Sequence, residues 1–284
     1  MGKRKKPEAN GTVKRTSKLV RPECNDFPAE YTNRIVCADC RNVLKRFPDN
    51  SVDCIITSPP YNFNVNYKGT DDNLPAEDYF HRLYEVLDEC CRVLKEDGRL
   101  IINVQPLMSA HIPTHMLIGN HLLQKGMIWY TDIIWNKNHY NCRSSAFGSF
   151  KLPSAPYIKS TWEYVIVFAK GFLKHFGNSD DADMTKDEFL TYVNGMWSIA
   201  PERRMKEFGH PAMFPEELAT RLIKLFTYKN DVVVDPFNGA GTTTLAAAKT
   251  GRRYLGVDVS VDYCATAQKR LDDIKKSNER RRNA

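Results

Sequence analysis

The sequence predicts an α/β fold in which helices cover both faces of a doubly wound, mostly parallel sheet. Apolar segments alternate with amphipathic segments along the chain, which is the order expected when helices connect parallel strands. Several apolar segments are hydrophobic at almost every position, as strands that are buried on both faces require. The expected strands cover residues 34–38, 52–57, 99–104, 128–135, 162–169, 232–236 and 253–259.

Helical spacing of apolar residues separates these strands. The clearest pattern spans residues 77–96 and is followed by Gly98, a residue type that commonly ends helices. The other expected helices cover residues 111–125, 215–228, 242–250 and 260–276. Two irregular stretches are longer than ordinary connections, and loops of that length often carry function. They are residues 136–160 and 170–210.

The chain divides into a basic arm, a large body and a basic tail. Residues 1–26 have few apolar side chains and no periodicity, and we interpret them as a flexible arm. The body covers residues 27–276, and residues 277–284 form the tail. Residues 1–21 hold eight basic side chains and one acidic side chain, which accounts for the whole net charge of +7. Such an arm either contacts a polyanion or is a solvated tail, and composition leaves both readings open.

Composition predicts a cytoplasmic protein. The chain has 284 residues, 42% of them hydrophobic, which is enough for one sizeable core. The sequence contains no run of eighteen apolar residues that would predict a membrane span. The basic N-terminus lacks the apolar stretch of a secretory signal. The eight cysteines are irregularly spaced. No second pair of ligands accompanies Cys37 and Cys40, so we expect reduced thiols and no metal site.

A rigid corner follows the apolar strand at residues 52–57. It reads TSPPYN at residues 57–62, and its two prolines fix φ and remove two N–H donors. The corner therefore presents carbonyl oxygens, which can accept hydrogen bonds from an amino group while the ring of Tyr61 stacks on the heterocycle. Open α/β sheets bind ligands at the carboxyl ends of their strands. Taken alone, the tetrapeptide Ser-Pro-Pro-Tyr is explained equally well as an ordinary end of a strand.

A glycine-rich turn follows the apolar segment VVVD. The turn reads DPFNGAGTTT, and its Gly239 and Gly241 allow close backbone approach and positive φ. It lacks the Lys-Ser/Thr ending of a P-loop and the full GxGxxG spacing. Asp235, followed by a helix start, suits a ligand that carries an ammonium and a carboxylate group. Asp258 ends the next strand, where an acid binds ribose hydroxyls in nucleoside-binding sheets, so the two acids together predict a nucleoside cofactor.

Five blocks of residues 27–274, taken in order, resemble the circularly permuted amino-methyltransferases of DNA, the β group. This order places the corner before the glycine-rich turn, whereas most other S-adenosylmethionine enzymes place the cofactor loop first. The blocks are NRIVCADCRNVLKRFPDNSVDCIITSPPYN, YFHRLYEVLDECCRVLKEDGRLIINV, WEYVIVFAKG, HPAMFPEELATRLIKLF and VVVDPFNGAGTTTLAAAKTGRRYLGVDV. The resemblance implies the fold of S-adenosylmethionine-dependent methyltransferases, S-adenosylmethionine as cofactor, and methyl transfer to a base amine of double-stranded DNA. It leaves a homodimer and a cognate restriction nuclease open.

The resemblance also implies roles for individual residues. The methionine part of the cofactor would be held by Asp235, Phe237, Gly239, Gly241, Thr242 and Thr243, with His210, Pro211 and Phe214 beside it. The nucleoside part would be held by Asp39, Cys40 and Asp258. The target base would be held by Ser58, Pro59, Pro60 and Tyr61. Without the resemblance, His210 would read as an ordinary loop histidine.

The sequence excludes one kind of methylation reaction and leaves several others open. Methylation of cytosine C5 needs a cysteine nucleophile, usually displayed after a proline, and no proline in this chain precedes a cysteine. In the family, serine before Pro-Pro tends to accompany cytosine N4, so Ser58 favours cytosine, with adenine N6 as the alternative. Enzymes that methylate RNA or protein amides use similar corners, but with the cofactor loop first. A DNA-binding module with a decayed cofactor site is opposed by the intact pair Asp235 and Asp258.

Two loops are candidates for reading DNA. Residues 136–160 contain basic and aromatic side chains and no acidic residue, and we expect Arg143 and Lys151 to contact bases or phosphates. A solvated connection between two strands is the alternative. Residues 170–209 are the second candidate loop. We expect core positions for Trp129, Trp135 and Trp162, and surface positions for the charges of Glu163 and Lys170.

Overall fold

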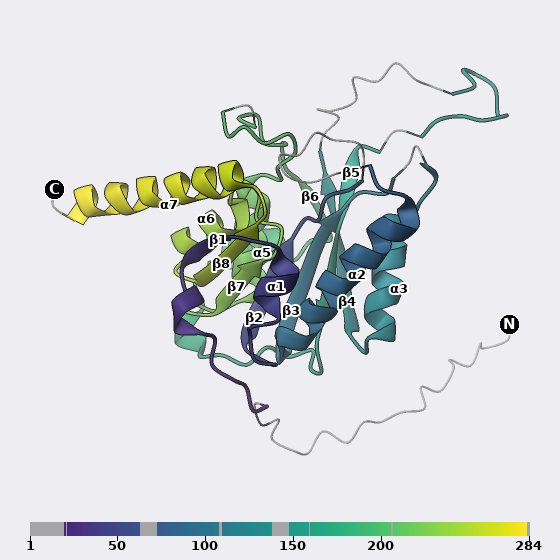
Figure 1. The fold of residues 1–284 in the computed structure, drawn as a ribbon. Helices are drawn as coiled ribbons and strands as arrows, with labels where there is room; N and C mark the ends of the chain where they lie inside the picture. Colours follow the sequence, from purple (N-terminus) through teal and green to yellow (C-terminus); the bar gives the residue numbers. More distant parts are fainter. Residues whose placement is uncertain are drawn as a thin grey trace, which may run out of the picture.

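The computed structural model describes residues 20, 22–62, 73–107, 110–137, 148–158, 160–205 and 207–282. Within them the chain forms one eight-stranded sheet that lies between two layers of helices (Figure 1). The predicted fold class, a doubly wound and mostly parallel α/β sheet, is confirmed. No helix in these ranges is long and apolar enough to cross a membrane.

Five neighbouring strands of the sheet are parallel, and one strand next to them runs the other way. In sheet order the strands are β1 (Arg34–Cys37), β8 (Arg253–Asp258), β7 (Val232–Asp235), β2 (Val52–Thr57), β3 (Leu94–Val104), β5 (Trp162–Ala169), β4 (Ile128–Asn136) and β6 (Met196–Ser198). Only β5 is antiparallel to its neighbours. The carboxyl ends of the other seven strands therefore meet at one edge of the sheet, together with the amino end of β5.

Helices cover both faces because the strands are apolar on both faces. Val232 and Val234 of β7 pack into one apolar cluster with α1 (Cys40–Leu44), α2 (Ala76–Val93) and α3 (Thr114–Gln124). Val233, which points the other way, packs into a second cluster with α5 (Glu216–Phe226), α6 (Thr242–Lys249) and α7 (Val261–Arg282). The remaining elements are α4 (Lys186–Tyr192), which packs against α5, and the 3-10 turns η1 (Ala29–Tyr31) and η3 (Ser179–Asp181).

The helix expected over residues 77–96 ends at Val93, and β3 begins at the next residue. Gly98 therefore lies inside a strand, which corrects its expected role after a helix. A Cβ at Gly98 would lie 2.8 Å from the carbonyl oxygen of Asp53. The buried ammonium of Lys95, which bonds Asp53 Oδ1 at 2.6 Å, fixes the start of this strand against β2. Close packing of two strands, and not a helix end, explains this glycine.

The outer part of the sheet departs from two further expectations. Trp129 was expected in the core, but its side chain is 54% exposed, because β6 pairs only with the last three residues of β4. Trp135, within that covered end, is buried as expected. The stretch expected to be irregular over residues 170–210 contains η3, α4 and β6. Its first part packs on the opposite edge of the sheet, where His175 bonds Asp231 just before β7.

Candidate active site

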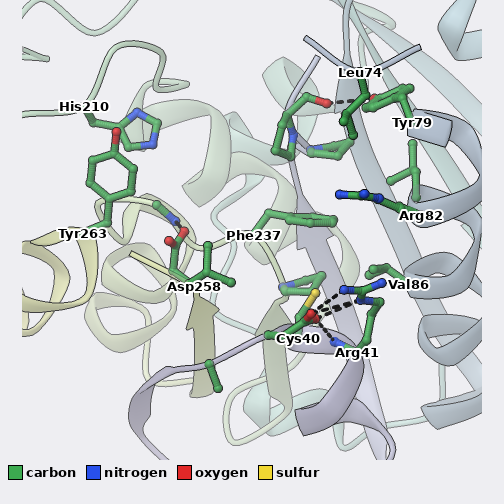
Figure 2. A pocket seen from close by; sticks show the side chains of 18 residues that line it. Cys40, Arg41, Leu74, Tyr79, Arg82, Val86, His210, Phe237, Asp258 and Tyr263 are labelled. Atoms are coloured by element: carbon green, nitrogen blue, oxygen red, sulfur yellow. Dashed lines mark hydrogen bonds and ion pairs between the residues drawn. The ribbon is translucent and has the colours of Figure 1, made fainter. Parts of the chain in front are cut away.

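The carboxyl edge of the parallel strands holds two adjoining pockets. The two pockets share Pro59, His210, Phe237 and Gly239. The first pocket has a volume of about 210 Å³ and is lined mainly by residues after β1, β7 and β8 and by α2. The second has a volume of about 170 Å³ and is lined by residues around the ends of β2, β3, β4 and β5 and by the segment 201–214. In Figure 2, the ring of Phe237 lies between the side chains of Tyr79 and Arg82 and those of His210 and Tyr263.

Two aspartates mark the first pocket. Asp258, at the end of β8, accepts hydrogen bonds from the backbone N–H groups of Gly239 and Ser260, each at 2.8 Å, and burial raises its pKa. Asp39 caps α1 and bonds the guanidinium of Arg41 at 2.6 Å, and this bond lowers the pKa of Asp39. The pocket is therefore lined by two carboxylates at the ends of the paired strands β1 and β8, and Figure 2 shows Asp258 beside Tyr263.

Apolar side chains form most of the rest of the first pocket, which Arg41 and Arg82 also line. The apolar lining includes Pro60, Leu74, Leu83, Val86 and the rings of Tyr79 and Phe237. Cys40 lines it as a buried thiol, and burial raises the pKa of this thiol to about 12. Flat apolar walls with carboxylates at their margins fit an aromatic heterocycle that carries hydroxyl groups.

The glycine-rich turn connects the two pockets. Gly239 has a φ of 48°, and a Cβ there would lie 2.6 Å from Nε2 of His210. Gly241 has a φ of 81° and is the N-cap of α6; a Cβ there would lie 2.7 Å from Cβ of Ala267. Gly239 therefore keeps the pocket open, whereas Gly241 serves the packing of α6 on α7 and does not line either pocket. Thr242 lines the second pocket.

Asp235 is a buried carboxylate between two neighbouring strands, β7 and β2. Its Oδ1 accepts from Thr57 at 2.7 Å and from the N–H of Phe237 at 3.1 Å, and its Oδ2 accepts from Thr243 at 2.7 Å. Burial raises the pKa of Asp235 to about 6 in spite of these bonds. The bond to Thr57 links the glycine-rich turn directly to the residue before Ser58. Asp235 also lines the second pocket.

The Ser-Pro-Pro-Tyr corner lies where the two pockets meet. The hydroxyl of Tyr79 donates a hydrogen bond to the carbonyl of Pro60 at 2.8 Å. The carbonyls of Ser58 and Pro59 are therefore the oxygens of this corner that can accept hydrogen bonds from a ligand. The hydroxyl oxygens of Ser58 and Tyr61 are 2.9 Å apart. Ser58, Pro59 and Tyr61 line the second pocket, and Pro59 and Pro60 line the first.

A polar cluster that sequence reasoning missed completes the second pocket. Glu163 was expected on the surface, but it is 6% exposed and forms an ion pair with the buried Lys137. Its Oε2 accepts from Tyr61 at 2.9 Å and from the amide of Asn103. The surface position expected for Lys170 is also wrong, since its half-buried ammonium bonds the carbonyl of Leu94 at 2.8 Å.

The signal that could have located this cluster is positional. Glu163 is the second residue of β5, whose amino end lies at the carboxyl edge of the parallel strands, and Lys137 directly follows β4. Asn103 is the next-to-last residue of β3 and lies at the same edge. A polar residue at each of three adjacent strand ends indicates a site, provided that the direction of each strand is known.

The segment between β6 and α5 covers both pockets. Pro211 and Phe214 line the second pocket together with His210. Burial lowers the pKa of His210 to about 4, so its imidazole is neutral at neutral pH. Lys151 is exposed in the described part of the loop that follows β4, and Arg143 lies outside the described residues. The described residues contain no group of three or more His, Cys, Asp or Glu side chains that could hold a metal ion.

Comparison with known proteins identifies the family. The family model described as DNA methylase, for N6 and N4 methyltransferases, matches residues 52–269. The type II methyltransferase M.BglII of Bacillus subtilis is 29% identical over 256 residues, which cover 84% of this chain and 69% of that protein. The DNA adenine methyltransferase YhdJ of Escherichia coli K12 is 28% identical over 261 residues, which cover 86% of this chain and 85% of YhdJ.

A solved structure agrees in fold. The structure of TTHA0409 of Thermus thermophilus, in complex with S-adenosyl-L-methionine, is similar to this one with a TM-score of 0.64 and 30% sequence identity. The matched region covers 84% of this chain and 94% of TTHA0409. With its fold and its two pockets, the chain belongs to the N6 and N4 family of DNA methyltransferases. The members of this family are enzymes that depend on S-adenosylmethionine, and the predicted cofactor is thereby confirmed.

Proposed function

We propose that this protein transfers a methyl group from S-adenosylmethionine to the exocyclic amine of a base in double-stranded DNA, with cytosine N4 as the favoured position. One observation carries the proposal. The Ser-Pro-Pro-Tyr corner after β2 and the glycine-rich turn after β7 lie on neighbouring strands, and the 2.7 Å bond between Thr57 and Asp235 joins them. A pocket suited to a nucleoside therefore adjoins a pocket suited to an amine.

The residues of the first pocket fit the cofactor. The carboxylate of Asp258 uses one N–H bond on each oxygen, which leaves lone pairs for two ribose hydroxyls. Phe237 and the apolar wall from α2 suit the adenine ring, with Asp39 and Cys40 at its edge. Asp235 and Thr242 suit the amino acid part, because they combine a carboxylate with the N-terminus of helix α6.

The corner supplies orientation and electrostatic stabilisation to the reaction. The cofactor brings a methyl group that its sulfonium charge already activates. The amine of the base is a poor nucleophile, since its lone pair is delocalised into the ring. The carbonyls of Ser58 and Pro59 accept the two amine hydrogens, which favours tetrahedral geometry at nitrogen and directs its lone pair at the methyl group.

The base must leave the double helix to reach this pocket. We propose that Tyr61 and Phe214 bound the flipped base from its two sides, because both line the second pocket beside the corner. His210, which is neutral and lies against Gly239, separates the base from the cofactor turn without placing a positive charge next to the sulfonium.

Ser58 supports cytosine N4 as the target, and adenine N6 is the second candidate. The adenine candidate is supported by the similarity to YhdJ, which is described as a DNA adenine methyltransferase. The two are separated by incubating the protein with plasmid DNA and cofactor, digesting the DNA to nucleosides, and identifying the methylated nucleoside by mass spectrometry. Single-molecule sequencing of the same plasmid gives the recognition site. Methylated RNA or protein, with unmodified DNA, would contradict the proposal.

The basic loop after β4 is our proposed reader of DNA. It leaves β4 at the edge that holds the second pocket, and its described part exposes Lys151 beside Phe150. We expect Arg143→Ala to cost about 1–3 kcal/mol of specific binding and to relax one position of the recognition site if Arg143 contacts a base. Equal weakening on all sequences would assign Arg143 to a phosphate instead. We also propose a cytoplasmic location and a cognate nuclease, as for a type II modification system.

A further inference from the structure

We infer that Ser58, Tyr61 and Glu163 form a proton relay that carries the proton of the methylated amine away from the reaction centre. The inference rests on the proposed function, amine methylation at the Ser58 corner. When nitrogen gains its bond to the methyl carbon, the bond between that carbon and sulfur breaks, and nitrogen becomes positively charged. It must then lose one N–H proton. Carbonyl oxygens can hold this hydrogen in a bond but are far too weakly basic to keep it.

The corner has no base of its own. A serine hydroxyl at neutral pH both donates and accepts hydrogen bonds, but it is not a proton acceptor unless it passes its own proton on. Its neighbour is Tyr61, at 2.9 Å between the two hydroxyl oxygens, and the neighbour of Tyr61 is Glu163, at 2.9 Å. These two contacts lead from the second pocket to a carboxylate in two steps.

The chemistry of the partners fixes the direction of both hydrogen bonds. An ionised carboxylate accepts only, so Tyr61 donates its single hydrogen to Glu163. The bond between the two hydroxyls must then be donated by Ser58 to Tyr61. Ser58 is left with lone pairs on the side of the second pocket, where an amine hydrogen can reach them. The hydrogens therefore already point from the corner to Glu163. The carbonyl of Asn103, which can also accept from Tyr61, is more distant at 3.3 Å.

Charged and polar partners surround the carboxylate of Glu163 and fix its position. Lys137 forms an ion pair with its Oε1, while Tyr61 and the amide of Asn103 bond its Oε2. The same amide also donates to the hydroxyl of Tyr61 at 2.9 Å. Buried charges are retained in proteins when they are paired, and a carboxylate so placed is available to accept a proton at the moment of reaction.

The step balances as three concerted transfers. The amine hydrogen that the carbonyl of Ser58 accepted turns to Oγ of the same residue and is transferred there as a proton. The former proton of Ser58 moves to the hydroxyl oxygen of Tyr61, and the former proton of Tyr61 moves to Oε2 of Glu163. The products are the neutral methylated amine and a protonated Glu163, with Ser58 and Tyr61 unchanged. Glu163 returns its proton to water when the product leaves the open pocket.

The test compares Tyr61→Phe, Glu163→Gln and the double variant in single-turnover methylation of a DNA duplex. Tyr61→Phe keeps the stacking ring and removes only the hydroxyl, and Glu163→Gln keeps the shape and removes the acceptor. We expect each single variant to lose about 100-fold to 10,000-fold in the methylation rate, the range typical of acid–base catalysis, with unchanged affinity for DNA and cofactor. The double variant should lose no more than either single variant, because the residues act as one unit. The wild-type rate should also fall in D2O through several exchanging protons, and both single variants should lose this dependence.

Glu96→Gln is the matched control, since Glu96 pairs with Lys170 near the start of β3, at the opposite edge of the sheet. It should methylate at the wild-type rate. A Glu163→Gln variant that methylates at that rate overturns the relay while leaving the proposed function intact, and so does a double variant whose losses multiply. A wild-type protein that methylates no DNA amine overturns the proposed function and the relay with it. If Glu163→Gln does not fold, Tyr61→Phe alone decides, because it touches no ion pair.

Discussion

Replacement of Asp235 by asparagine should stabilise the protein at alkaline pH and weaken its hold on the cofactor. The carboxylate is buried, and this burial raises its pKa from the ordinary value of 3.8 to about 6. The folded state therefore binds this proton more tightly than the unfolded state does. The contribution of this proton to the stability of the fold is fully present below pH 3.8, and it is lost as the pH rises through 6. Above pH 6 the ionised side chain costs the fold about 3 kcal/mol.

Asparagine keeps the geometry without the charge. Its oxygen can accept from Thr57 and from the N–H of Phe237 as Oδ1 does now. Its amide can donate to Thr243, whose hydroxyl hydrogen then turns to the carbonyl of Ile56 at 3.4 Å. We therefore expect Asp235→Asn to raise the free energy of unfolding by about 3 kcal/mol at pH 8 and by only about 0.5 kcal/mol at pH 4. At pH 8 this corresponds to a melting temperature higher by about 5 °C.

Urea titrations of the cofactor-free protein at pH 8 and pH 4 measure this difference, and calorimetry measures cofactor affinity in the same samples. Loss of a charge-assisted bond to the ammonium should weaken cofactor binding by about 10-fold to 100-fold. Asp273→Asn, at an exposed position of α7, is the control and should change neither quantity. An Asp235→Asn variant that is less stable than the wild type at pH 8 would show that the three hydrogen bonds outweigh burial.

Three further predictions follow from the geometry. Tyr61→Ala should leave cofactor affinity in calorimetry largely intact but abolish turnover and weaken DNA binding by about 1–3 kcal/mol, whereas equal loss of both ligands would refute the separation of the two pockets. Gly239→Ala should displace His210, because its Cβ would lie 2.6 Å from Nε2 at a φ of 48°, and should lower cofactor affinity; wild-type affinity would show that the segment 201–214 yields freely. Deletion of residues 1–21 should leave the methylated DNA sequence unchanged. It should make the slope of log affinity for DNA against log salt concentration shallower by about 0.9 for each lost phosphate contact, and an unchanged slope would show that the arm does not touch DNA.

The sequence predicts the position of the glycine-rich turn because the turn follows a continuous apolar strand. Val232 to Val234 can be nothing but a buried strand, and the acids Asp235 and Asp258 then mark its end and the end of the next strand. Local pattern is sufficient here, since parallel strands place their carboxyl ends together whatever the rest of the chain does.

The polar cluster of the second pocket could not be predicted in the same way. Glu163 looks like a surface charge at the start of a strand, and its burial follows only from the antiparallel direction of β5 between β3 and β4. The exposure of Trp129 likewise depends on how little of β4 the three-residue strand β6 covers. Helix α1 was missed because five residues are too short to show a helical period.

The pairing of β1 with β8 has a consequence for the synthesis of this protein. Among the described residues, β1 pairs with β8 alone and one side of β2 pairs with β7 alone, so both remain incomplete until β7 and β8 have left the ribosome. Until then, two apolar strands near the start of the chain expose unpaired backbone, which invites association with other chains. The nascent protein holds a finished Ser-Pro-Pro-Tyr segment but no Asp258 opposite Asp39. Methyl transfer therefore requires β7 and β8, the strands that carry Asp235 and Asp258.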